Sequence, residues 1–158
     1  MKALVVYDSF FGNTKQVALA IGNAIGSQGN VKTLHVSDAK PEHLKGLDVL
    51  IVGSPTRAFR PTKPIIGFLN SIPQDGLKGI KVAAFDTRVS TKDVQSRFLD
   101  MMMRLFGYAA EPIADRLKKK GGALIAQPEG FFVKDSEGPL KDNELERASS
   151  WIRSAVMA

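Results

Sequence analysis

The sequence predicts an α/β fold in which a doubly wound, five-stranded parallel sheet lies between two layers of helices. Segments with strand character alternate with segments of helical periodicity along the chain. The segment 48–52 is continuously apolar after its first residue, which is typical of a parallel strand buried on both faces. Polar loops follow three of the expected strands, at 9–14, 54–60 and 86–88. The carboxyl ends of parallel strands meet at one edge, so these loops are expected to converge there.

The first strand and helix are the most clearly marked elements. The apolar, β-favouring run 4–7 breaks into the polar turn 8–14. After the turn, Val17, Ala18, Ile21 and Ile25 recur at helical spacing, and the sequence 29–30 (Gly-Asn) is a typical helix end. The segment 3–28 is therefore expected to form a strand, a short turn and a helix.

The later elements continue this alternation. Strands are expected at 31–36, 48–52 and 80–85 and from 123 to 126, and helices in a short segment from 41, through 65–69, at 108–120 and at 142–156. His35 falls on the polar side of its strand, so we expect it at the surface. The whole chain, 1–158, is predicted to be one domain.

Composition narrows the class of protein. Hydrophobic residues make up 44% of the 158 residues and charged residues 24%, which is typical of a globular domain. Cysteine is absent, so thiolate metal sites and cysteine nucleophiles are excluded, and the two histidines are isolated in sequence. No secretory or membrane-spanning apolar segment is evident. We therefore expect a cytoplasmic protein without a membrane partner.

The net charge of +6 invites a nucleic-acid hypothesis, but no supporting motif is present. The tight basic run 116–120 lies at an expected helix end, where lysines interact favourably with the helix dipole. We therefore predict no nucleic-acid partner.

The turn 8–14 has the chemistry of a phosphate site. Free backbone N–H groups at a helix N-terminus attract anions, Ser9 and Thr14 add hydroxyl groups, and Gly12 allows the backbone to approach a ligand closely. Lys15 is expected either to assist or to be an ordinary surface lysine. The alternative is that Ser9 and Thr14 only cap the helix. Neither a Walker A motif nor Gly-x-Gly-x-x-Gly is present.

The stretch resembles the phosphate-loop signature of flavodoxins. The matching positions are Tyr7, Ser9, Gly12, Thr14, Ala18 and Ile21. The resemblance extends over essentially the whole chain and implies the flavodoxin-like strand order 2-1-3-4-5, in the short-chain form. It also implies FMN as the cofactor, with its phosphate surrounded by Ser9, Phe10, Gly12, Asn13 and Thr14.

By the same resemblance, the second and third loops hold the flavin ring. The backbone of Ser54, Pro55, Thr56 and Arg57 would meet the ring edge. Phe59 would stack on a face of the ring, the alternative being an anchor of the following helix in the core. The third loop would contribute Asp86, Thr87 and Arg88, but it lacks the Tyr often found there.

The expected charge around the ring also departs from that of familiar acidic flavodoxins. Arg57, Arg60, Lys63 and Arg88 are expected near it, with Asp86 as their acidic neighbour. Positive charge stabilises an anion, so we expect a less negative potential for the second electron. A basic rim also indicates acidic redox partner proteins or anionic substrates.

The segment 89–106 is longer than its counterpart in the short family form. Its part 93–106 is helix-like, with an apolar stripe that includes Val94, Phe98 and Met101. We expect either a lid beside the flavin or a homodimer face, the alternative being ordinary core packing.

The leading functional hypothesis is an FMN-binding electron-transfer protein. An FMN-dependent NAD(P)H:quinone-type reductase and a flavin-free interaction scaffold remain as alternatives, so the sequence leaves enzymatic activity open. A phosphoacceptor receiver domain is disfavoured, because its acidic cluster is reduced here to Asp8.

Overall fold

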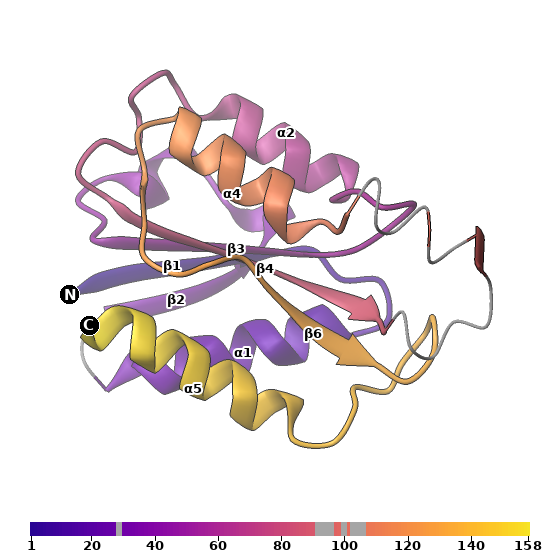
Figure 1. The fold of residues 1–158 in the computed structure, drawn as a ribbon. Coiled ribbons are helices and arrows are strands. Elements are labelled where there is room, and N and C mark those ends of the chain that lie inside the picture. The colour runs from indigo at the N-terminus through magenta and orange to yellow at the C-terminus, as the bar shows by residue number, and fades with distance from the viewer. Residues whose placement is uncertain (28–29, 91–96, 99–100, 102–106) are drawn as a thin grey trace.

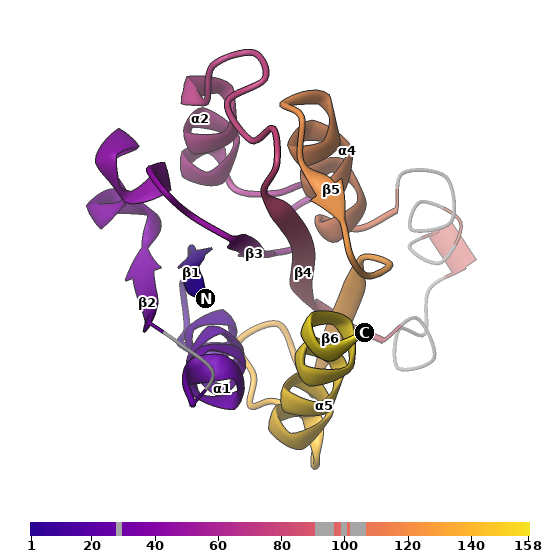
Figure 2. The same cartoon turned by 90° about the vertical axis from the view of Figure 1, so that its left-hand side faces the viewer.

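The computed structural model of the chain describes residues 1–27, 30–90, 97–98, 101 and 107–158. It shows the predicted three-layer arrangement, with a parallel sheet between two pairs of helices (Figure 1). Seen end-on, α1 and α5 cover one face of the sheet, and α2 and α4 cover the other (Figure 2). The strand order β2-β1-β3-β4-β5 confirms the predicted topology.

The elements lie close to their predicted positions. The strands are β1 (Lys2–Tyr7), β2 (Asn30–His35), β3 (Val49–Pro55), β4 (Lys81–Val89), β5 (Ala123–Leu124) and β6 (Glu129–Val133). The α-helices are α1 (Asn13–Gly26), α2 (Lys63–Ser71), α4 (Ala110–Lys119) and α5 (Glu144–Met157), and short 3₁₀ helices occupy Val36–Asp38 and Pro41–Leu44. The predicted helix 93–106 lies almost entirely outside the described residues.

The last position of the sheet is filled by two segments rather than by one continuous strand. β5 pairs with the start of β4, where Lys81 lies opposite Ala123, and β6 pairs with its end, from Phe85 opposite Glu129 onward. The connecting residues 125–128 end in Pro128, which has no N–H to donate to a neighbouring strand. The predicted strand from 123 to 126 is therefore interrupted after Leu124.

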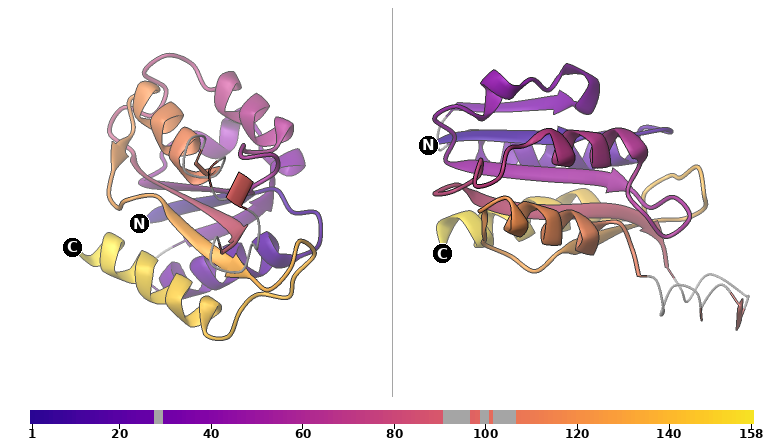
Figure 3. Two further views of the ribbon diagram at one scale, coloured as in Figure 1. Left: turned by 45° about the vertical axis from the view of Figure 1, so that its right-hand side comes forward. Right: turned by 90° about the horizontal axis from the view of Figure 1, so that it is seen from above.

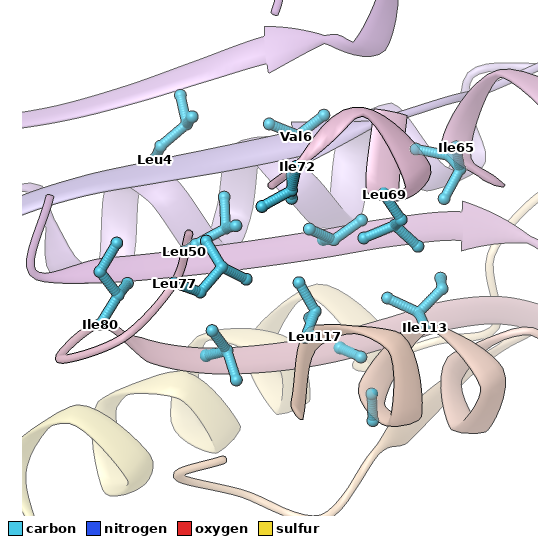
Figure 4. Close-up of a cluster of buried hydrophobic side chains, with 14 of the residues drawn as sticks. Leu4, Val6, Leu50, Ile65, Leu69, Ile72, Leu77, Ile80, Ile113 and Leu117 are labelled. Carbon is cyan, nitrogen blue, oxygen red and sulfur yellow. The ribbon is translucent and has the colours of Figure 1, made fainter. Parts of the chain in front are cut away.

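Two apolar cores lie on either side of the sheet, and the strands alternate between them. Leu4, Leu50 and Val82 face α2 and α4, in the cluster drawn in Figure 4. Their neighbours along the strands, such as Val5 and Ile51, face α1 and α5. Each such side chain contributes about 1.5–3 kcal/mol when fully buried. This two-sided burial explains why the central strands are continuously apolar in sequence.

Aromatic rings fill part of the core between the sheet and the helices α1 and α5. Phe131 lies edge-on to Phe85 at 6.2 Å between ring centres and edge-on to Trp151 of α5 at 5.9 Å. Gly53 leaves room for this cluster, because a Cβ at that position would lie 2.0 Å from the Phe85 ring. The polar loop that follows β3 therefore starts from a tightly packed base.

We expect Gly53→Ala to destabilise the protein by about 1–3 kcal/mol, because the added methyl group overlaps the Phe85 ring. Gly67→Ala is the matched control. It lies inside α2 with nothing within 4 Å of its Cβ position, so it should raise the free energy of unfolding by about 0.5–1 kcal/mol. Urea denaturation of both variants measures the difference. Equal changes would contradict the packing described.

Candidate functional site

The turn between β1 and α1 adopts the conformation that an anion site requires. Gly12 is the N-cap of α1 and has φ +91°, in the left-handed region that favours glycine. Ser9 Oγ accepts hydrogen bonds from the N–H groups of Gly12 (3.1 Å) and Lys15 (3.4 Å). Ser9 therefore caps the helix, as the capping alternative expected. Thr14 does not act as a cap.

Other N–H groups of this turn remain available for a ligand. The backbone N–H groups of Phe10, Phe11, Asn13 and Thr14 have no acceptor among the residues that the structure describes. Those at the start of α1 have none within the helix either, because the first N–H groups of any helix lie beyond its hydrogen-bond ladder. The helix dipole places partial positive charge at the same position, so this donor set fits a phosphate group.

The polar loops converge at one end of the sheet, opposite the two chain termini (Figures 1 and 3). They enclose a pocket there, and most residues predicted for the site line it. These are Ser9, Phe10, Asn13, Thr14, Pro55, Thr56, Arg57, Thr87 and Arg88. The predicted residues Gly12, Ser54, Phe59 and Asp86 are not part of the lining.

A chain of hydrogen bonds ties the three loops together. Thr14 Oγ1, at the start of α1, and Thr87 Oγ1, near the end of β4, lie 2.8 Å apart in a buried position. The Thr56 N–H donates to the Thr87 carbonyl at 3.0 Å, and Thr56 Oγ1 accepts from the N–H of Ala109, just before α4, at 3.1 Å. The walls of the pocket are therefore held in place by the protein's own polar groups.

The second loop forms a tight hairpin turn. Arg57 and Arg60 exchange two backbone hydrogen bonds of 2.9 Å, and the residues between them, Ala58 and Phe59, have φ values of +48° and +68°. Such turns normally use Asn or Gly, and a non-glycine residue in this region costs about 1–3 kcal/mol. Phe59 is half-buried and is not among the residues of the two core clusters.

Ser54 supports this loop from below rather than facing the pocket. Its side chain is fully buried. Its Oγ accepts from the Thr62 N–H at 3.0 Å and donates to the Pro55 carbonyl at 2.8 Å. Ser54 therefore fixes the start and end of the second loop against each other.

Residues 86–88, predicted to form the third loop, instead continue β4 to Val89, and they contain an ion pair in which Asp86 is fully buried. The Arg88 guanidinium donates two hydrogen bonds of 2.7 Å to Asp86, whose carboxylate also accepts from the Ala110 N–H. Burial raises the pKa of the Asp86 carboxyl, while Arg88 and the Ala110 N–H oppose that rise. The charge of Arg88 is thus largely balanced at the site. The sequence predicted both residues but not their direct pairing.

Tyr108 provides an aromatic ring that sequence reasoning missed. The Arg88 guanidinium lies over its face, 3.6 Å from the ring centre. A Cβ at Gly130 would overlap the Arg88 side chain at 2.0 Å, so the glycine leaves the arginine its place.

A fourth loop, after β6, completes the pocket and was also missed. Val133 and Ser136 line it, together with Phe11 and Val89 from loops already considered. Asn13 Nδ2 donates to the Glu137 carbonyl at 3.1 Å, and Gly138 lies so close that a Cβ would overlap the Asn13 amide. The sequence did contain a signal for this loop: polar residues follow Val133 at the end of a strand, where ligand-binding loops of parallel sheets lie.

His35 lies at the surface as predicted, with 37% of its side chain exposed, but it is also hydrogen-bonded. Its Nδ1 accepts from the Ser37 N–H at 3.1 Å, so its Nε2 is assigned as the donor to Asp8 Oδ1, also at 3.1 Å. Asp8 is buried, and the same oxygen accepts from the Ser9 N–H. His35 therefore supports the start of the phosphate turn from the neighbouring strand.

The described residues contain no cluster of His, Cys, Asp or Glu that could hold a metal ion. Within the described part of the chain, no helix is long and apolar enough to cross a membrane. Phe98 and Met101 are the only members of the predicted apolar stripe that are described, and both are exposed.

Comparison with solved structures confirms the resemblance to flavodoxins. A flavodoxin from the domain Archaea is 28% identical, with a TM-score of 0.73 over 99% of this chain and 98% of that one. Oxidised flavodoxin 1 from Bacillus cereus is 17% identical, with a TM-score of 0.78 over the same shares of the two chains. The rubredoxin oxygen:oxidoreductase of Desulfovibrio gigas is 19% identical, with a TM-score of 0.72, and this chain covers 36% of it. No protein-family model and no curated protein sequence matches this chain.

The buried hydroxyl pair of Thr14 and Thr87 predicts a specific pattern of stability. Either Thr→Val change should cost about 1–3 kcal/mol, because it leaves the other hydroxyl buried without its partner. The double variant should cost less than the sum of the two, because both polar groups are then absent. Urea denaturation of the four proteins measures this coupling. Thr→Ser variants, which keep the hydroxyls, are the controls, and strictly additive losses would contradict the pairing.

Proposed function

We propose that this protein binds FMN in the pocket and works as an electron-transfer protein. The observation that carries this proposal is the set of N–H groups at Phe10, Phe11, Asn13 and Thr14. These residues line a pocket together with residues 55–57 and 87–89 at the ends of the next two strands. The same arrangement of loops is expected of a fold that the chain shares with flavodoxins. The cofactor, once bound, would supply the electron-accepting and electron-donating chemistry.

The residues of the chain would bind and orient the cofactor. The first turn would hold the phosphate through its N–H groups and through the Thr14 hydroxyl. Residues 55–57 and 87–89 would lie along the ring, and the hydrogen bond from the Thr56 N–H to the Thr87 carbonyl fixes the two segments relative to each other. Arg57 would add positive charge at the ring, whereas Arg88 is paired with Asp86.

The phosphate turn predicts a preference for FMN over riboflavin. We expect FMN to bind at least about tenfold more tightly, which corresponds to about 1.4 kcal/mol. Gly12→Ala should weaken FMN binding by about tenfold and leave riboflavin binding unchanged, because it strains the turn that holds the phosphate. Fluorescence quenching titrations of both flavins measure these affinities.

Gly79→Ala is the matched control for this experiment. Gly12 and Gly79 both have φ in the left-handed region, at +91° and +83°, and neither has an atom within 4 Å of its Cβ position. The two variants should therefore lose similar stability, but Gly79→Ala should keep the affinity for FMN. Equal affinity of the wild type for FMN and riboflavin would refute the phosphate site.

The number of electrons that the bound flavin accepts in each reduction step distinguishes an electron-transfer protein from the reductase alternative. Dithionite titration of the FMN-loaded protein should show two separate one-electron steps, and the protein should not oxidise NAD(P)H steadily by itself. Reduction in a single two-electron step, together with steady NAD(P)H oxidation, would favour the reductase. If the protein takes up no FMN, the flavin-free interaction scaffold would be the hypothesis that remains.

Arg57 is expected to raise the potential of the second electron, because a positive charge stabilises the anionic, fully reduced flavin. Arg57→Gln should make this potential more negative by on the order of tens of millivolts, as expected for a charge several ångströms away. Lys119→Gln, at the end of α4 far from the pocket, is the control and should leave it unchanged. A spectroscopic redox titration measures both. A more positive potential in Arg57→Gln would contradict the charge argument.

A further inference from the structure

Two adjacent aromatic side chains of the phosphate turn line the pocket and are also about half exposed to solvent. Phe10 is 56% exposed and Phe11 is 50% exposed. Apolar side chains of this size are normally buried, so two consecutive exposed ones require an explanation. Aromatic residues, together with arginine, are the side chains that dominate the energetics of protein–protein interfaces.

The surroundings of these rings are basic. The Arg57 guanidinium lies 4.8 Å from the centre of the Phe10 ring. Lys15, Arg60 and Lys63 are exposed on the same two loops or at the starts of their helices. None of these four cations forms a salt bridge with a described residue.

The sequence around them contains no compensating acid. Residues 9–37 and 49–74 include no Asp or Glu. The loop after β6 contains Asp135, Glu137 and Asp142, and it touches the first turn where the Glu137 carbonyl accepts from Asn13 Nδ2. The first two loops thus carry exposed cations without an acidic residue of their own, whereas the segment after β6 mixes both signs of charge.

We propose that Phe10, Phe11, Arg57, Arg60 and Lys63 form the docking surface for an acidic redox protein. This inference rests on the proposed function, since an electron carrier must present its cofactor to its partner at short range, and this surface borders the pocket. The aromatic rings supply buried contact area, while the cations steer an acidic partner to the rim and orient it. Nucleic acid fits less well, because the acidic side chains after β6 would repel a phosphate backbone.

The test is an NMR titration of the ¹⁵N-labelled protein at low salt with an acidic haem protein, cytochrome b5, and with a basic one, cytochrome c. The acidic protein should shift the signals of residues 10, 11, 57, 60 and 63, and raising the salt should abolish the shifts. The basic protein should leave these signals unchanged. Shifts from cytochrome c on the same residues, or from cytochrome b5 around Lys119 and Lys120, would overturn the proposal. So would tighter binding of a single-stranded oligonucleotide to the same surface.

Variants outside the pocket lining test the role of charge. The double variant Arg60→Glu/Lys63→Glu should weaken binding of cytochrome b5 at least about tenfold. Lys119→Glu/Lys120→Glu changes the net charge equally at the opposite end of the sheet and should leave binding unchanged. Equal losses in the two double variants would show that only net charge matters and would overturn the proposed surface.

The titration does not require bound flavin, so the two proposals can fail separately. A chain that binds FMN but shows no shifts with cytochrome b5 would refute the docking surface alone. A chain that binds the acidic protein at this surface but takes up no FMN would refute the proposed function and leave an interaction surface.

Discussion

Parallel pairing of β1, β3 and β4 is the constraint from which the other features of this molecule follow. Two parallel neighbours cannot be joined by a tight turn, so α-helices make the crossings, except between β2 and β3, where two short 3₁₀ helices do so. The crossings bury both faces, which confines polar residues to the ends of the strands. The chain therefore gathers its polar groups at one end of the sheet, where the pocket lies.

The elements governed by local sequence were predictable. Residues 49–52 contact the two cores alternately, which requires a continuous apolar strand. The change from strand to helical periodicity after Tyr7 located the first turn within a residue or two. The capping role of Ser9 and the left-handed conformation of Gly12 are likewise determined by a few neighbouring residues. Knowledge of parallel sheets then sufficed to predict that the loops meet, and the pocket contains most of the residues expected there.

The parts that could not be predicted depend on contacts between distant segments. Asn13 binds the Glu137 carbonyl across 124 positions of sequence, and His35 reaches Asp8 from the neighbouring strand. Neither contact leaves a signal in local composition or periodicity. Asp86 and Arg88 were both predicted for the site; Arg88 lines the pocket, while Asp86 is buried and pairs with it, which the sequence did not indicate.

The interrupted fifth position of the sheet has a consequence for how these molecules behave in concentrated solution. An exposed sheet edge offers unpaired N–H and C=O groups that can recruit a strand from another molecule and begin aggregation. Here β5 is two residues long, and residues 139–141 fold back on the end of β6, where the Lys134 N–H donates to the Pro139 carbonyl and the Lys141 N–H donates to that of Phe132. This edge is therefore a poor template for strand addition, which leaves β2, a regular strand of six residues at the opposite edge, as the side of the sheet where another strand could add.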